Sequence, residues 1–286
     1  MSNANSTGGV IGLGMIGAGV ATCLARSGQL AAVYDVRADA TDDIPGCPAL
    51  SATPKALAQA TDTVLIAVVS AKQTIDVLTG EQGVLAAARP GLNVVLLATV
   101  SLTDLAEIRA LTDAAGVGLI DSGVTGGQKA KENGLVCLVG GTGDAIAKVR
   151  PVLDGFALSV AHMGPAGAGM AAKIARNVVV YGCLRAGYEA AALCRNAGVD
   201  VNQLTKVIED SSQGVGGPMM LMSRADPLTD PQEAGIREYT RGLMIKDLEA
   251  ARDLGQTFGI QLPLVELAIS TDMAVVGLTD VMGEKA

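Results

Sequence analysis

Lys173 and Asn177, in this chain of 286 residues, form a pair whose residue types and spacing could do chemistry. Residues four apart share one face of an α-helix, so the ammonium and the amide would point the same way. Because the expected helix begins at a junction between two domains, both groups could reach a ligand in the cleft there. The spacing alone fits equally well a surface lysine beside an asparagine on the same helix face.

A second set of polar groups lies in the segment 121–127, which reads Asp-Ser-Gly-Val-Thr-Gly-Gly directly after an expected strand. Small residues and glycines let consecutive backbone N–H groups point at one anion, as in a nest. A plain turn after the strand would explain the glycines but not the hydroxyls of Ser122 and Thr125. The segment therefore predicts a loop that binds an anion.

A third pattern is G-x-G-x-x-G at 12–17, which follows the apolar residues Val10 and Ile11 and precedes an amphipathic segment. In dinucleotide-binding proteins the first glycine permits a tight turn, the second lets the backbone approach a pyrophosphate, and the third lets the helix pack closely on the strand. The N-terminus of the helix then presents unpaired N–H groups to the phosphates. The motif alone is a weak indication, but the flanking strand and helix supply its context.

Asp35 closes the next expected strand, 31–34, at a spacing that suits a carboxylate bonded to the adenosine ribose. A carboxylate at this place repels the additional phosphate of NADP, so NAD is the favoured cofactor. Arg37 keeps NADP open, because its guanidinium could bind a phosphate through two hydrogen bonds. The alternative for Asp35 is a capping residue in a solvated turn.

The elements that must position these residues alternate between strands and helices through the first half of the chain. Helices are expected to open at 51–54, at Ser101 and after Gly143-Asp144, and strands at 10–11, 31–34, 64–69, 94–97, 117–120, 135–139 and 158–161. Such alternation predicts an α/β fold with a Rossmann-type, doubly wound, mostly parallel sheet. A ligand should then lie beyond the carboxyl ends of the strands, against the loops after Val69, Leu97 and Ile120.

After Pro165 only helices are expected, one over 169–197 and others from Asp200, Tyr239 and Leu262. We expect a dinucleotide-binding domain at 1–165, with 1–8 disordered, and an all-helical substrate and dimerisation domain at 166–286. Its apolar helices would leave hydrophobic surface exposed in a monomer, which favours a homodimer or a dimer-based oligomer. Loops such as 211–218 should decide substrate size.

The composition narrows the classes of partner. A net charge of −8 without a clustered basic face argues against nucleic acid, and no apolar run has the length of a membrane span. The five cysteines are scattered without C-x-x-C spacing, which suggests neither a disulfide framework nor a metal site and fits a cytoplasmic protein. The single histidine, His162, precedes Gly164-Pro165 and is expected to be structural.

Together these segments resemble the β-hydroxyacid dehydrogenase family, the group that contains 3-hydroxyisobutyrate dehydrogenase and tartronate semialdehyde reductase, over nearly the whole chain. The family's G-x-G-x-x-x-K-x-x-x-N segment is matched completely by Gly167, Gly169, Lys173 and Asn177. Its glycine-rich loop is matched with Ile16 in place of methionine. Its D-x-P-V-S-G-G segment is similar to 121–127, with glycine replacing proline and threonine replacing serine, and Lys246-Asp247 looks like the family's K-D-L.

The resemblance implies a role for each matching residue. Lys173 would act as the general acid/base, Asn177 would donate a hydrogen bond to the substrate, and Thr99 and Lys246 would lie near the cofactor. The glycine at 123 predicts a pocket of different shape from that of the usual family member. The implied substrate residues are Ser122, Gly123, Thr125, Gly126 and Gly127, and the implied cofactor residues are Gly12, Leu13, Gly14, Met15, Ile16, Gly17, Asp35, Arg37, Val68, Val69, Thr99 and Lys246.

The resemblance also implies the reaction, a reversible hydride transfer between NAD or NADP and a small 3-hydroxy acid or its semialdehyde or keto form. An imine or ketimine reductase on the same architecture is a second possibility, although related imine reductases generally carry another residue in place of Lys173. A third is a regulatory protein that binds the nucleotide without catalysis, against which the retained Lys173 and Asn177 argue.

Overall fold

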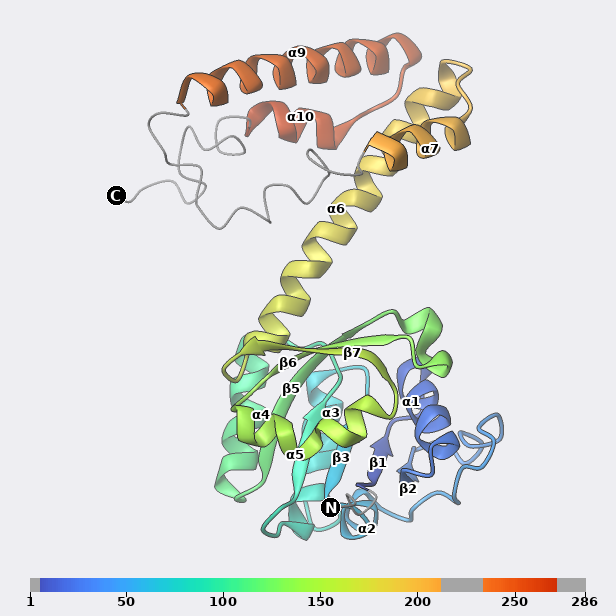
Figure 1. The fold of residues 1–286 in the computed structure, drawn as a ribbon, viewed down its shortest axis with the longest axis vertical. Helices are drawn as coiled ribbons and strands as arrows, with labels where there is room; N and C mark the ends of the chain where they lie inside the picture. The colour runs from blue at the N-terminus through green and yellow to red at the C-terminus, as the bar shows by residue number, and fades with distance from the viewer. Residues whose placement is uncertain (1–5, 212–233, 272–286) are drawn as a thin grey trace. The chain divides into compact units, whose positions relative to one another are not determined.

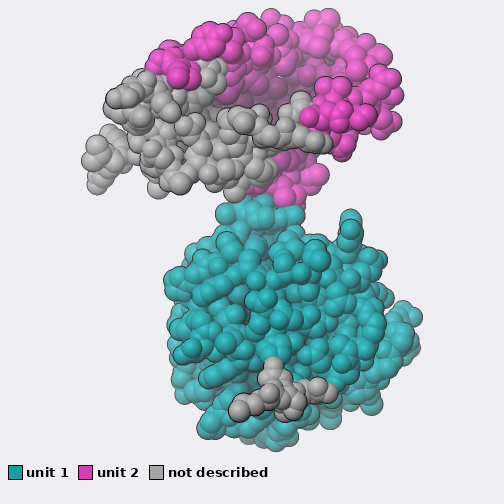
Figure 2. Space-filling model, viewed as in Figure 1, with its two compact units in different colours: residues 1–178 teal, residues 179–286 magenta. Residues whose placement is uncertain are grey.

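The computed structural model describes residues 6–211 and 234–271, and the account that follows concerns these residues. They divide into two compact units, 1–178 and 179–286, each treated by itself (Figure 2). The expected domain boundary at 165 stays a prediction, because this division falls within a helix. Most of the loop 211–218, from Ser212 on, lies outside the described residues.

The first unit is built on a seven-stranded sheet in the order β2-β1-β3-β4-β5-β6-β7 (Figure 1). Every neighbouring pair is parallel except β5 and β6, which run antiparallel. The mostly parallel, doubly wound fold expected from the sequence is therefore confirmed. The strands are β1 (Gly8–Ile11), β2 (Leu30–Tyr34), β3 (Thr63–Ile66), β4 (Asn93–Leu96), β5 (Gly118–Thr125), β6 (Leu135–Gly140) and β7 (Ala157–Gly164).

Two hydrophobic clusters bury the two faces of the sheet. The apolar sides of α1 (Met15–Arg26) and α5 (Gly143–Asp154) contribute to the first cluster. The second takes in residues of α2 (Pro54–Gln59), α3 (Ala71–Leu78) and α4 (Leu102–Ala114). The central strands β1, β3 and β4 are buried at every residue, as expected for parallel strands with both faces covered.

The helices begin where the sequence places capping residues. The hydroxyls of Thr53, Ser101 and Thr142 each accept a hydrogen bond from a first-turn N–H of α2, α4 and α5. At α4 the cap is reciprocal, because the Ser101 hydroxyl also donates to Asp104 Oδ2 at 2.7 Å. Two short 3₁₀ helices, η1 (Val84–Ala87) and η2 (Gly127–Glu132), complete the unit.

The prediction that residues 1–8 are disordered is wrong for residues 6–8, which the structure describes. Residues 1–5 lie outside the described part, but Gly8 opens β1 and is buried. The carbonyl of Ser6 accepts from Gln29 Nε2 at 3.3 Å, and that of Thr7 accepts from Thr61 Oγ1 at 2.7 Å. These long-range bonds tie the polar segment before the strand to the sheet.

Beyond β7 the described residues contain helices and no strand, as expected. They are α6 (Ala168–Asn196), α7 (Val201–Ser211), α9 (Ala234–Phe258) and α10 (Pro263–Ser270). The start of α10 is bound by the buried carboxylate of Glu189, which accepts from the backbone N–H of Leu264 at 2.9 Å. None of the described helices combines the length and apolar character that a membrane crossing would need.

Candidate active site

The G-x-G-x-x-G segment forms the turn between β1 and α1. Gly12 has φ +85°, a left-handed conformation that disfavours other residues, so the tight turn is confirmed. A Cβ on Gly17 would lie 1.8 Å from the Gly12 carbonyl oxygen, so only glycine lets α1 sit this close to the strand. Gly14 caps α1 without a side-chain hydrogen bond, and the first turn holds no acidic residue. The first-turn N–H groups are therefore left for an anionic ligand.

Asp35 and Arg37 lie against this turn and are bonded to it. Asp35 Oδ2 accepts from the Leu13 N–H at 2.6 Å, and Arg37 Nη2 donates to the Leu13 carbonyl at 3.0 Å. The two side chains also form an ion pair at 3.1 Å. Burial opposes the charged form of Asp35, but the hydrogen bonds from Arg37 and Leu13 outweigh it and lower the pKa of the carboxyl. Both backbone groups of Leu13 are thus engaged within the protein, and the free amides lie further along, in the first turn of α1.

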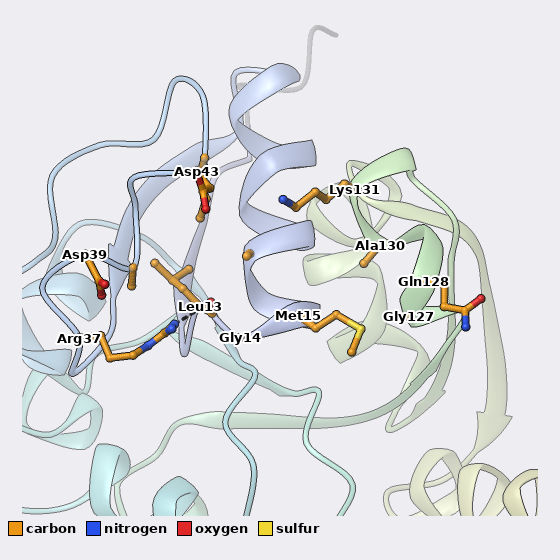
Figure 3. Close-up of a pocket in the computed structure, with 13 residues that line it drawn as sticks. Leu13, Gly14, Met15, Arg37, Asp39, Asp43, Gly127, Gln128, Ala130 and Lys131 are labelled. Atoms are coloured by element: carbon orange, nitrogen blue, oxygen red, sulfur yellow. Dashed lines mark hydrogen bonds between the residues drawn. The ribbon is translucent and has the colours of Figure 1, made fainter.

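Two cavities adjoin the glycine turn. One of about 390 Å³ extends from Gly12 and Gly14 past Asp35 to the expected cofactor residues Val68 and Val69 after β3. The other, of about 490 Å³, runs beside the first turn of α1 (Figure 3). In this view Arg37 and Asp39 lie on one side of the turn, and Gln128 and Lys131 of η2 lie on the other. An extended, anionic ligand thus has space on both sides of the free amides.

The expected anion-binding loop at 121–127 is wrong over 121–125, because these five residues continue β5. They pair with β6 in antiparallel register, from Asp121 opposite Gly140 to Thr125 opposite Val136. Successive N–H groups of a strand point to opposite sides within the sheet, towards the neighbouring strands, so they cannot converge on one anion as in a nest. The turn comes only at Gly126, with φ +84°, where η2 begins.

The alternation along β5 separates Ser122 from its neighbours. Asp121, Gly123 and Thr125 share one face, whereas Ser122 is 0% exposed on the opposite face, beside the buried Cys137 thiol. Burial raises the pKa of Cys137 to about 12, and the Ser122 hydroxyl is buried without a hydrogen-bond partner among the described residues. The Ser122 hydroxyl therefore belongs to the core, and we do not carry it into the proposed substrate site.

Asp121 has a function that the sequence analysis missed. Its carboxylate is 2% exposed and accepts from the N–H groups of Gly167 at 2.7 Å and Met170 at 2.8 Å, at the start of α6. A carboxylate at this end of a helix also complements the helix dipole. The partners are 46 and 49 residues apart, so no local capping pattern could reveal the contact. Asp121 fixes the start of α6 on β5.

Lys173 is held directly over β5 by this arrangement. A Cβ on Gly123 would lie 2.2 Å from Lys173 Cβ, so the glycine at 123 is what allows the helix to approach. Lys173 is 8% exposed, and burial, together with the charge of Arg176, lowers the pKa of its ammonium. Thr125 lies on the same face of β5 one pleat further along, and Asn177 follows one turn later on α6. Lys173 and Asn177 share one face of α6, as their spacing in the sequence predicted, and the place of Thr125 beside them stays a prediction.

The remaining predicted residues are placed as follows. Thr99 is exposed after β4, at the edge of the sheet where a ligand is expected. Lys246 belongs to the second unit, where its side chain is 70% exposed and lies 3.2 Å from Asp247, so its place near the cofactor stays a prediction. His162 Nε2 lies 2.9 Å from the carbonyl oxygens of Gly141 and Gly164, in the structural position expected.

Within the described residues, the remaining cysteine, histidine and acidic side chains form neither a disulfide nor a candidate metal site. All five cysteines lie within the described residues and are free. Across 6–211 and 234–271, no cluster of three or more histidine, cysteine, aspartate or glutamate side chains could hold a metal ion.

Models of two protein families match this chain. Residues 7–164 match the NAD binding domain of 6-phosphogluconate dehydrogenase. Residues 167–275 match a domain described as the NAD-binding domain of NADP-dependent 3-hydroxyisobutyrate dehydrogenase. The first match alone covers more than half of the sequence.

Individual proteins match over almost their whole length. The NAD-dependent L-serine dehydrogenase of Pseudomonas aeruginosa is 31% identical over 91% of this chain and 89% of its own. The structure of Mycobacterium tuberculosis 3-hydroxyisobutyrate dehydrogenase with L-serine has a TM-score of 0.65 at 28% identity, covering 95% of this chain and 94% of that one. An imine reductase variant from Myxococcus stipitatus with NAD⁺ has a TM-score of 0.78 at 19% identity, covering 95% and 94%, and shows the fold alone. The chain therefore belongs to the β-hydroxyacid dehydrogenase family of NAD(P)-dependent oxidoreductases.

Proposed function

We propose that this protein interconverts a small 3-hydroxy acid, similar to 3-hydroxyisobutyrate or L-serine, with its semialdehyde or keto form. The observation that carries the proposal is the position of Lys173, buried over Gly123 of β5 and on the same helix face as Asn177. The relatives named for L-serine and 3-hydroxyisobutyrate support this substrate class.

The cofactor would be held by the first-turn N–H groups of α1 at Met15 and Ile16 and by the Asp35 carboxylate. The uncapped helix start beside two cavities fits a pyrophosphate, so the residues present suit the group. When bound, the nicotinamide accepts or supplies the hydride. Thr99 and Lys246 are proposed to lie near it, and Val68 and Val69 near the adenosine.

Lys173 would move the proton. In the direction of oxidation its amine must be neutral to take the hydroxyl proton, and burial favours the neutral form. In the direction of reduction the ammonium polarises the carbonyl oxygen and returns the proton. Asn177 would donate a hydrogen bond to the reacting oxygen, while Thr125, Gly126 and Gly127 would hold the carboxylate.

The contacts of Asp35 and Arg37 support NAD rather than NADP as the cofactor. Asp35 is ionised at neutral pH, because its hydrogen bonds with Arg37 and Leu13 lower its pKa. It would repel an additional phosphate, which favours NAD. Arg37 contacts both Asp35 and Leu13, so it must leave these partners before it can bind the phosphate of NADP.

We further propose a homodimer or dimer-based oligomer in the cytoplasm. Support comes from the large apolar side chains of α6 that remain exposed in the described chain, which are Ile174, Val178, Tyr181, Leu184 and Tyr188. Their spacing of three and four residues places them along one side of the helix.

The experiment that tests the reaction is a substrate panel. Short 3-hydroxy acids, their aldehydes and cyclic imines would each be supplied with NAD or NADP, and nicotinamide absorbance followed. We expect turnover with hydroxy acids and preference for NAD. Turnover of imines alone would favour the imine reductase, for which the fold similarity to solved imine reductases is the supporting observation. Nucleotide binding without turnover of any compound would favour a regulatory protein.

A further inference from the structure

Arg176 lies one turn after Lys173 on α6 and has no assigned function so far. In a helix each residue turns by about 100°, so Arg176 and Asn177 flank Lys173 on its two sides within a single narrow arc. Arg176 is exposed and Asn177 is half-buried, so neither side chain is enclosed in the core. The three residues form one continuous polar face.

The guanidinium of Arg176 is bonded to this face. Its Nη1 donates to Asn177 Oδ1 at 3.3 Å. When the carbonyl oxygen of an asparagine side chain is engaged in this way, its NH₂ group is left to donate elsewhere. The hydrogen bond thus selects the orientation of Asn177 that a substrate oxygen needs.

The charge of Arg176 also acts on Lys173. Two like charges three residues apart on one helix face repel, which disfavours the ammonium form of the lysine. The charged side chains of β5 and α4 that lie around the start of α6 have partners of their own. Asp121 of β5 is bonded to the backbone of α6, Arg109 of α4 pairs with Asp113 at 3.5 Å, and β6 carries no charged residue.

We propose that Arg176 is a positioning residue of this site, which orients the Asn177 amide towards the substrate and keeps Lys173 in its proton-accepting form. The inference rests on the proposed function of Lys173. The inference explains why the cation of Arg176 lies beside the buried Lys173. A general base works best when it is neutral near the working pH, and a neighbouring positive charge favours the neutral amine.

Three variants separate the two effects of Arg176. Arg176→Lys keeps the charge, Arg176→Gln keeps a donor for Asn177, and Arg176→Met removes both. We expect the acid-side midpoint of the kcat/KM profile for oxidation to rise by about half a pH unit in Arg176→Gln and Arg176→Met, and to return in Arg176→Lys. The shift should shrink at high salt, because the charge is exposed. The KM for the hydroxy acid should rise by about threefold to tenfold in Arg176→Met and less in Arg176→Gln.

Two controls make the outcome decisive. Lys148→Gln removes an exposed charge from α5, on the opposite face of the sheet, and should leave the midpoint unchanged. The pH dependence of Lys173 acylation, read by peptide mass spectrometry without substrate, should show the same shift in Arg176→Gln. Retained turnover in Lys173→Gln would remove the proposed acid/base function and this inference with it. An inactive Lys173→Gln together with unchanged midpoints in Arg176→Gln and Arg176→Met would overturn the inference alone.

Discussion

The starts of α1 and α6 are two solutions to one problem, a helix that begins in close backbone contact with the sheet. At α1 the contact is made by Gly17, and the first-turn N–H groups have no side-chain acceptor. At α6 the buried Asp121 carboxylate accepts from Gly167 and Met170. An open helix start can bind a ligand, whereas a closed one can only position the residues that follow. In the proposed function the first start holds the cofactor and the second positions Lys173.

Among changes to the backbone contacts and caps of these two helix starts, the largest effect is expected from a carboxylate at the open start of α1. Gly14→Asp places a carboxylate at the N-cap of α1, where it can accept from the free amides and repel a pyrophosphate. NAD affinity measured by calorimetry should fall by about 100-fold, while the thermal stability of the free protein holds or rises. Gly14→Ala separates bulk from charge, since no atom lies within 4 Å of the added Cβ. Equal losses in the two variants would contradict the proposed use of the amides.

Filling the contact between α6 and β5 should be the next most severe change. Gly123→Ala places a methyl group 2.2 Å from Lys173 Cβ and must displace the lysine. We expect kcat to fall by about tenfold to 100-fold, because a shift of about 1 Å at the reacting groups has that order of effect. The dissociation constant for NAD should not change. Gly143→Ala, at an open position in the first turn of α5, is the matched control and should keep full activity.

Removing the Asp121 acceptors at the start of α6 is expected to lower the free energy of unfolding more than it changes cofactor binding. Asp121→Asn replaces one of the two acceptor oxygens with a donor, which should lower the free energy of unfolding by about 1.5–3 kcal/mol. The kcat should fall as α6 loosens, and NAD affinity should remain. Asp144→Asn changes an exposed carboxylate in the first turn of α5 and should cost about 0.3–1 kcal/mol. Similar unfolding curves for the two variants would show that Asp121 does not hold α6.

The smallest expected effect concerns cofactor choice. Asp35→Asn removes the charge that would repel the phosphate of NADP and releases Arg37 from its ion pair. The ratio of kcat/KM for NADP to that for NAD should rise by about tenfold. Arg37→Gln in the same background should cancel the gain. Wild-type preference for NADP would overturn the assignment of Asp35.

The sequence predicted the parts of this account that depend on short-range patterns. The seven strands, the cap at Ser101 and the glycine turn all follow from local apolar runs and capping residues. The Lys173 and Asn177 pair follows from helical spacing. What failed depends on pairing across the sheet. The antiparallel partner β6 extends β5 through Asp121–Thr125, turns Ser122 into the core and brings Asp121 to a helix 46 residues away.

We infer that the start of α6, closed by Asp121, delivers Lys173 to the reacting oxygen, and single-turnover hydride transfer in Lys173→Gln is the measurement that tests this. With saturating NAD and the best hydroxy acid of the panel, the rate should fall by about 100-fold to 10,000-fold, while NAD affinity and unfolding remain those of the wild type. A rate within a few-fold of the wild type in that folded, NAD-binding variant would contradict the account.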